Sequence, residues 1–265
     1  MRLFEPVSWR AIPPNAITAS AMACGIVSVF LSLSGTALAG LAGTHLQQAA
    51  WFVLLATLLD KADGSVARAL KGSSEFGVQF DSFADSIAFG VAPAALIFGA
   101  APVLAPRAWG PEAAVLGLPA GGLLGFICLA YAIFTAIRLA RFNVTTGNLG
   151  PSLFLGLPST LSGGLVCSAF LAVDELGAGS PGIYQLFPWL LACNAALMVS
   201  NLPLPKAHLT AHKFGRVLQI GAAVAVYGCV LARAGYVFVL LLLLGYLGVG
   251  FGWLGPRLWR QRLAQ

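Results

Sequence analysis

The residues best equipped for chemistry are four aspartates between residues 60 and 85. Asp60, Asp63, Asp81 and Asp85 are four of the five aspartates in a chain that has only nine acidic residues. They lie inside segments that are otherwise apolar. An ionised carboxylate is expensive in such surroundings, and its presence there is by default the mark of a functional site. We therefore expect these four side chains to form such a site.

The spacing predicts two helices that meet in a tight turn. Lys71 suits the last turn of the first helix and Gly72 the position just past it. Ser73 or Ser74 can cap the second helix, with Glu75 in its first turn. On each helix the aspartates share a face with small residues, by the three-and-four rule. These faces are Asp60, Asp63, Gly64, Ala67 and Lys71 on the first helix, and Gly77, Asp81, Ala84, Asp85 and Ala88 on the second.

Opposed aspartate faces would form a cleft lined by four carboxylates, which repel one another strongly in a low-dielectric site. Arg68 and Lys71 lie nearby in sequence but are too few to balance four carboxylates. Hard divalent cations, Mg²⁺ or Mn²⁺, prefer such oxygen ligands and also hold substrate phosphates. Two ions would neutralise the site and bind a pyrophosphate. The alternative is a buried ion-pair network that only holds helices together.

Composition predicts an all-α integral membrane protein with one membrane domain over residues 1–265. The chain is 58% hydrophobic and 9% charged, with a mean hydropathy of +0.87. Strand alternation is absent, which argues against a barrel. The net charge of +6 indicates orientation and contact with anionic lipid, and no nucleic-acid partner is expected. The cysteines are read as small core residues, at positions Cys24, Cys128, Cys167, Cys193 and Cys229.

Apolar runs long enough to cross a bilayer predict about eight spanning helices. Their approximate ranges are 16–33, 47–70, 76–99, 113–137, 158–174, 183–201, 215–232 and 235–255. Residues 1–15 are expected to form an interfacial segment with basic flanks. An alternative for the first run is a secretory signal with a cleavage site at Ala37-Leu38-Ala39.

The distribution of basic residues predicts the orientation. With eight spans and a cytoplasmic N-terminus, 13 of the 15 lysines and arginines fall on the cytoplasmic side, and only Arg107 and Arg233 on the far side. The chain is then a multi-pass protein of the cell membrane with both termini inside. The aspartate cleft lies at the cytoplasmic ends of the second and third spans.

Other polar residues fall near the same membrane face. Arg138 and Arg141 are three apart at the end of the fourth span, and either mark topology or hold a phosphate or carboxylate. His208 and His212 have a spacing that a metal site can use, but an exposed loop is the simpler reading. Asp174 ends the fifth span on the far side and is expected to be solvated.

The central window reads D-x2-D-G-x2-A-R-x8-G-x3-D-x3-D, from Asp60 to Asp85. It resembles the signature of the CDP-alcohol phosphotransferase family, with every motif position filled. Three further pieces resemble the phosphatidylserine synthase branch of that family. They are Pro14 to Thr18 (PNAIT), Asp81 to Ala94 (DSFADSIAFGVAPA) and Arg138 to Asn143 (RLARFN). A weaker likeness covers residues 156–158 and 197–200, and the residues that follow Pro158 depart from the Pro- and Ala-rich form expected there.

The resemblance implies a reaction in which CDP-diacylglycerol donates its phosphatidyl group to L-serine, giving phosphatidylserine and CMP. It also implies a six-helix core, a homodimer and an active site at the cytoplasmic membrane surface. Asp85 would be the general base and also approach the second ion. The implied roles are metal binding for Asp60, Asp63, Asp81 and Asp85, nucleotide or phosphate binding for Gly64, Ala67, Arg68, Gly77, Asn15 and Thr18, and acceptor binding for Arg138 and Arg141.

Two competing functions remain open from the sequence. One is another enzyme of the same family, with glycerol phosphate, inositol or a related alcohol as acceptor. The other is a cation transporter whose aspartates form the ion path. Transporter sites usually lie near the midplane, at broken helices or repeats. Here the acids gather at one membrane face and no second half mirrors them, which favours the enzyme.

Overall fold

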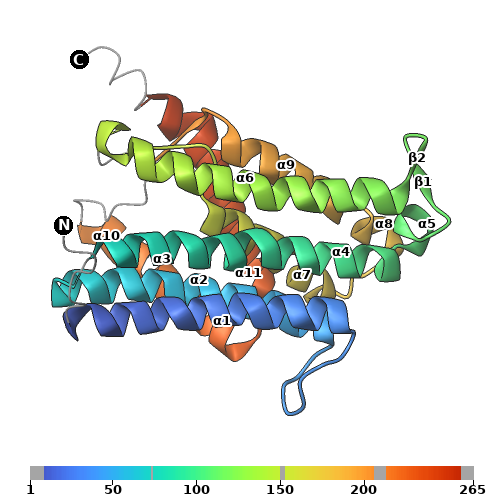
Figure 1. The fold of residues 1–265 in the computed structure, drawn as a ribbon, viewed down its shortest axis with the longest axis horizontal. Coiled ribbons are helices and arrows are strands. Elements are labelled where there is room, and N and C mark those ends of the chain that lie inside the picture. Colours follow the sequence, from blue (N-terminus) through green and yellow to red (C-terminus); the bar gives the residue numbers. More distant parts are fainter. Residues whose placement is uncertain (1–8, 73, 150–152, 206–212, 258–265) are drawn as a thin grey trace, which may run out of the picture.

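The computed structural model is a bundle of long helices that lie side by side (Figure 1). It describes residues 9–72, 74–149, 153–205 and 213–257. In chain order its elements are η1 (Trp9–Ala11), α1 (Ile12–Ser34), α2 (His45–Leu70), α3 (Glu75–Asp85), the π-helix η2 (Ser86–Val91), α4 (Ala92–Leu104), α5 (Pro106–Trp109), β1 (Ala114–Val115), β2 (Leu118–Pro119), α6 (Ala120–Leu149), β3 (Leu153–Leu155), α7 (Ser159–Glu175), α8 (Pro181–Tyr184), α9 (Phe187–Val199), β4 (Pro203–Pro205), α10 (Lys213–Ala232), α11 (Tyr236–Val249) and the π-helix η3 (Gly250–Leu254).

Each of the eight predicted spans contains a helix, but the fourth begins at Ala120 and not near residue 113, because residues 114–119 form β1, β2 and the turn between them. Five helical segments are long and apolar enough to cross a membrane, which fits a membrane protein. They are Trp9–Ser34, Glu75–Leu104, Ala120–Val144, Pro181–Val199 and Tyr236–Arg257. Three other predicted spans depart from that pattern for local reasons: α2 carries the charged residues of the motif in its last turns, α7 is only 17 residues long, and the apolar part of α10 is the shorter Gln219–Ala232. His208, His212 and the first eight residues lie outside the described residues.

The turn between α2 and α3 forms as predicted, with one difference. Ser74 caps α3, its hydroxyl accepting from the Gly77 N–H at 3.0 Å. The left-handed position at the end of α2 is taken by Lys71, with φ 49°, and not by Gly72. Gly72 is needed instead for a close approach, because a Cβ there would meet the Arg10 carbonyl. The turn therefore packs directly against η1, which immediately precedes α1.

Directly after Asp85 the helix widens into the π-helix η2, a feature that the sequence reading missed. The signal was Pro93, which has no N–H to donate to the Phe89 carbonyl and whose ring crowds that carbonyl. The Tyr131 hydroxyl donates to the Phe89 carbonyl instead, at 3.0 Å, and lies 3.0 Å from the Ser162 hydroxyl. Tyr131 thus joins α6, α7 and η2 immediately beside the motif.

Tyr131→Phe is expected to lower the free energy of unfolding by about 1–3 kcal/mol, because it leaves a buried carbonyl without its donor. Thermal unfolding in detergent, followed by intrinsic fluorescence, measures the change. The control is Tyr227→Phe, whose hydroxyl donates to the Leu58 carbonyl at 3.2 Å. That carbonyl lies inside the regular helix α2, so the control should lose much less. Equal losses in both variants would refute the role given to Tyr131.

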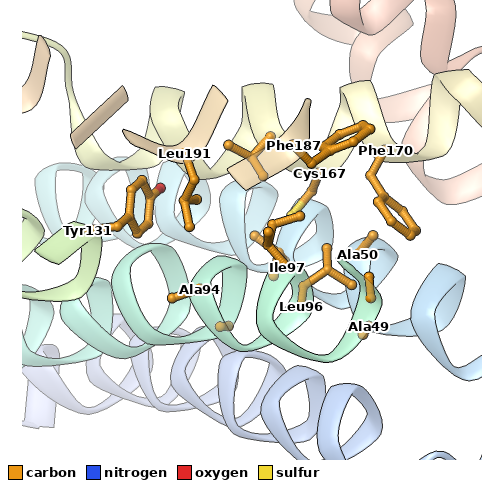
Figure 2. Packing of buried hydrophobic residues seen from close by; sticks show 14 of the residues in the cluster. Ala49, Ala50, Ala94, Leu96, Ile97, Tyr131, Cys167, Phe170, Phe187 and Leu191 are labelled. Carbon is orange, nitrogen blue, oxygen red and sulfur yellow. The ribbon is translucent and has the colours of Figure 1, made fainter. Parts of the chain in front are cut away.

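The apolar core lies between α2, α4, α6, α7 and α9. Figure 2 shows the small residues Ala49 and Ala50 of α2 near the larger Leu96 of α4 and Phe170 of α7. Small side chains let helices approach closely in lipid. The five cysteines are free. Cys128 and Cys167 are buried as predicted, but Cys193 is exposed on α9, which lipid tolerates because it is as apolar as the core.

Candidate active site

The motif aspartates gather at one end of the bundle. One carboxylate oxygen from each of Asp60, Asp63 and Asp81 can be chosen so that all three lie within 4.8 Å of one another. Asp63 is 6% exposed, and the other two are half-buried. Oxygens this close, drawn from three acids on two helices, suit a hard divalent cation after only small side-chain movements. The geometric expectation for the two helix faces is therefore met at these three residues.

Asp85 lies deeper than the other three and is 9% exposed. It is the last residue of α3 and lies close to Asp60 on one side and within electrostatic range of Arg138 on the other. It is not part of the three-oxygen cluster and does not line the cavity described below. The fourth aspartate is thus placed behind the cluster, towards α6.

Thr18 holds Asp63 in place. Its hydroxyl lies 2.6 Å from Asp63 Oδ2, to which it donates, and 3.0 Å from the Pro14 carbonyl in the preceding turn of α1. Both Thr18 and Asp63 are buried. The sequence reading gave Thr18 a nucleotide role, and its contact with a carboxylate was not foreseen. Helix α1 is consequently part of the site, which argues against its reading as a removable signal.

A cavity of about 450 Å³ opens beside the cluster. It is bounded by α1, the end of α2, the start of α3 and one residue of α6. Its lining residues are Pro14, Asn15, Thr18, Asp60, Lys61, Asp63, Gly64, Ala67, Arg68, Gly72, Ser74, Gly77, Val78, Asp81 and Phe142. Every residue predicted for metal or nucleotide binding lies here except Asp85. Phe142 was singled out only as part of a resembling segment, and Lys61 only as a topological charge.

The glycines of the motif serve two different purposes. A Cβ on Gly64 would meet only the Arg68 guanidinium, at 3.5 Å, so this position faces open space. A Cβ on Gly77 would lie 3.1 Å from both Asn15 Oδ1 and Ser74 Oγ. Gly64 therefore keeps room inside the cavity, whereas Gly77 lets α3 approach α1 closely.

Arg138 and Arg141 have different surroundings although both belong to α6. The Arg138 guanidinium is 8% exposed, donates to Ser159 Oγ at 3.0 Å and lies 5.3 Å from the centre of the Phe142 ring. The Arg141 guanidinium donates to the backbone carbonyls that end α9 and to β3. Its acceptors are the carbonyls of Val199 (3.0 Å), Ser200 (2.9 Å), Leu155 (3.2 Å) and Met198 (3.4 Å), and Asn201 Oδ1 (3.2 Å). Neither arginine lines the cavity.

The aspartates are not part of an ion-pair network. Among the described residues, none of the four carboxylates has a lysine or arginine nitrogen within 4.0 Å. Removing buried charges from water is repaid only by close partners. The purely structural reading of the cluster is therefore not supported, and the site is short of positive charge.

A sequence model of the CDP-alcohol phosphatidyltransferase family matches residues 11–200. The chain belongs to this family. The match covers α1 to α9, including every residue of the cluster and cavity, and ends before α10 and α11. The resemblance predicted from the motif is confirmed.

Named relatives agree on the branch. The chain is 32% identical over 200 residues to a CDP-diacylglycerol–serine O-phosphatidyltransferase of Helicobacter pylori, covering 76% of this chain and 74% of the relative. It is 29% identical over 197 residues to the Bacillus subtilis protein of the same name, covering 72% and 89%. An archaetidylserine synthase of Methanothermobacter thermautotrophicus is 30% identical over 198 residues, covering 73% and 69%.

Proposed function

We propose that this protein is a CDP-diacylglycerol–serine O-phosphatidyltransferase, which makes phosphatidylserine and CMP. The observation that carries the proposal is the cavity whose walls are formed by the family motif, with three carboxylates gathered on one side. Relatives that bear this name or that of archaetidylserine synthase match most of the chain. The acceptor is therefore assigned as serine ahead of glycerol phosphate or inositol.

The residues present fit two divalent cations, Mg²⁺ or Mn²⁺. Asp60, Asp63 and Asp81 offer oxygens within 4.8 Å of one another, and Asp85 lies close to Asp60 for the second ion. In the described part of the chain, no lysine or arginine lies at ion-pairing distance from the cluster, so added positive charge would relieve its repulsion. When bound, the ions would offset the charge of the pyrophosphate and of CMP as leaving group.

The nucleotide end of the donor is assigned to the cavity beside the cluster. Gly64 and Ala67 leave room for cytidine and ribose, and Arg68 is placed to contact phosphate. Gly77 and Asn15 form the opposite wall, where α3 meets α1. Thr18 serves the nucleotide indirectly, by fixing the Asp63 carboxylate.

Asp85 is proposed as the general base. A serine hydroxyl is a weak nucleophile and needs a positioned base to remove its proton. In the step, the serine oxygen forms a bond to the phosphorus that carries diacylglycerol, and the bond from that phosphorus to the CMP oxygen breaks. The hydroxyl proton passes to Asp85. The position of Asp85 behind the cluster, away from the nucleotide cavity, suits attack from the side opposite the leaving group.

The acceptor carboxylate is assigned to Arg138, a buried guanidinium within electrostatic range of Asp85. Arg141 was proposed for the same task from the sequence. Five protein oxygens already surround its guanidinium, so we give it a different part below. The charge distribution supports a multi-pass arrangement with the site and both termini at the cytoplasmic face, and a homodimer stays a prediction from the resemblance.

Gly64→Leu is expected to weaken binding of the donor by about tenfold or more, a loss of at least ~1.4 kcal/mol, because the new side chain fills the nucleotide cavity. The fold should tolerate it, since the position is open and leucine favours helix over glycine. Titration of CMP in the presence of Mn²⁺ measures the effect. Gly245→Leu is the control, because a Cβ on that glycine of α11 would meet no atom within 4 Å and the position lies outside the cavity.

A panel of acceptors tests the proposed function. Purified protein in lipid nanodiscs receives CDP-diacylglycerol, Mn²⁺ and one of L-serine, glycerol 3-phosphate or inositol. We expect equal amounts of CMP and phosphatidylserine with L-serine and little CMP with the other two. Faster CMP release with another acceptor would reassign the substrate within the family. If none of the three acceptors leads to CMP release, the protein is not a transferase. That result is the one expected of the transporter alternative.

A further inference from the structure

We infer that Ser159 and Thr160, the first turn of α7, complete the acceptor subsite beside Arg138, and that Arg141 is the positioning residue for this turn. The inference rests on the proposed function, because it concerns how the acceptor is held. From the sequence, these two residues stood out only as the start of the stretch that departs from the Pro- and Ala-rich form expected after Pro158. They adjoin the site from the side away from the nucleotide cavity.

The first turn of α7 contacts the reactive side of the cluster. Ser159 is fully buried and its hydroxyl accepts from Arg138 at 3.0 Å. Thr160 lies close to the Asp60 carboxylate, which in turn lies close to Asp85. Asp60 also lines the nucleotide cavity, so it stands between that cavity and the α7 turn. In-line transfer needs the attacking and leaving oxygens on opposite sides of the phosphorus. The turn is thus on the side from which the acceptor must come.

Two observations indicate that this turn suits an anion. Helix α7 follows Pro158, which gives it no side-chain cap, and its first intrahelical bond is from the Ser162 N–H to the Pro158 carbonyl. In the described part of the chain, the N–H groups of residues 159–161 therefore have no hydrogen-bond acceptor. Independently, the buried Arg138 guanidinium donates one hydrogen bond to a described residue, Ser159, although it carries five N–H groups.

Charge balance makes the same point. Among the described residues, no carboxylate lies within 4.0 Å of the buried Arg138 guanidinium. A buried guanidinium needs a close anion to be stable. The carboxylate of an amino-acid acceptor meets that need, and uncapped N–H groups at a helix start add donors for it. An acceptor without a carboxylate leaves the charge uncompensated.

Arg141 fixes where the turn lies. Its guanidinium ties the Leu155 carbonyl of β3 to the carbonyls that end α9. Next along the chain, Gly156 has φ 73° and its Cα faces the same carbonyls so closely that a Cβ would lie 2.5 Å from the Met198 oxygen. The Leu157 N–H then donates to the Leu197 carbonyl at 3.0 Å. Helix α7 begins two residues later, so Arg141 fixes the position of Ser159 and Thr160 relative to Arg138.

The test uses Ser159→Ala, Arg141→Lys and the double variant in full-length protein in nanodiscs. The KM for L-serine should rise about tenfold in each single variant while the KM for CDP-diacylglycerol stays within about twofold, the split expected when only acceptor contacts change. The preference for L-serine over L-serinamide, which lacks the carboxylate, should fall by a similar factor. Lysine does not rescue Arg141, because three donors on one nitrogen cannot reach both segments.

If Arg141 acts through the α7 turn, the double variant should be no worse than the poorer single variant. Arg233→Lys, at the far end of the bundle where Arg233 stacks on Trp51, is the matched control and should leave both KM values unchanged. Additive losses, equal rises in both KM values, or an unchanged serinamide preference would each overturn the inference. Absence of any transfer to serine by the unaltered protein would instead overturn the proposed function.

Discussion

Asp85→Asn should reduce phosphatidylserine synthesis by about 10²–10⁴-fold, the usual contribution of a general base. Asparagine keeps the shape of the side chain but cannot take the serine proton. Binding of the donor in the presence of Mn²⁺ should stay within about threefold, under 1 kcal/mol, because Asp85 lies outside both the three-oxygen cluster and the nucleotide cavity. Timed assays of CMP release measure turnover, and equilibrium titration with CMP measures nucleotide binding, so the two effects can be separated.

The comparison with Asp60 makes the test specific to the base. Asp60→Asn alters a residue that belongs to both cluster and cavity, so it should weaken nucleotide binding as well as turnover. Asp85→Asn should affect turnover alone. Near-normal turnover in Asp85→Asn would rule out Asp85 as the general base. Loss of nucleotide binding in that variant would indicate that Asp85 acts mainly as a metal ligand.

The second large effect is expected for Asp63→Asn, which removes a carboxylate from the cluster. Metal-dependent binding of CMP should weaken by more than about 100-fold, since changes to residues that merely support metal ligands already reach 10–100-fold. The fold should persist, because the amide oxygen can still accept from Thr18. In the absence of metal the variant should be at least as stable as the parent, since one repelling charge is gone.

Asp174→Asn is the matched control for this change. Asp174 is the fifth aspartate, near the far end of α7, about 20 Å along the helix from Thr160 at 1.5 Å per residue. Both of its oxygens are held, by Gln47 Nε2 at 2.7 Å and the Tyr184 hydroxyl at 2.6 Å. Metal-dependent CMP binding should be unchanged in this variant. A loss there equal to that of Asp63→Asn would mean that binding reports general stability and not the cluster.

The sequence was sufficient where one local rule decides the outcome. Helical spacing placed Asp60, Asp63 and Asp81 on facing surfaces, and the cap rule identified Ser74 as one of two candidates. The turn itself was right, but the left-handed residue was assigned to glycine. Gly72 was required by the nearby Arg10 carbonyl, so Lys71 adopts the less favourable conformation. Competition of this kind between neighbours depends on tertiary contacts that spacing does not contain.

Longer-range contacts explain what the sequence left out. Thr18 and Asp63 are 45 residues apart, and their hydrogen bond follows from the packing of α1 on α2. The two arginines of α6 looked equivalent from a spacing of three residues. Their roles differ because carbonyls of β3 and of the end of α9 accept hydrogen bonds from Arg141, whereas the Ser159 hydroxyl accepts one from Arg138. Such roles depend on which distant segment of the chain packs against the end of a helix. Local spacing in the sequence does not contain that information.

The most direct test of the account is the number of Mn²⁺ ions that the motif binds. Electron paramagnetic resonance of the purified chain with CMP should count two bound Mn²⁺ per chain, and none at the same affinity in a variant with Asp60, Asp63 and Asp81 all changed to asparagine. Two bound ions in that variant, or tight CMP binding by the unaltered protein with all divalent cations chelated, would contradict it.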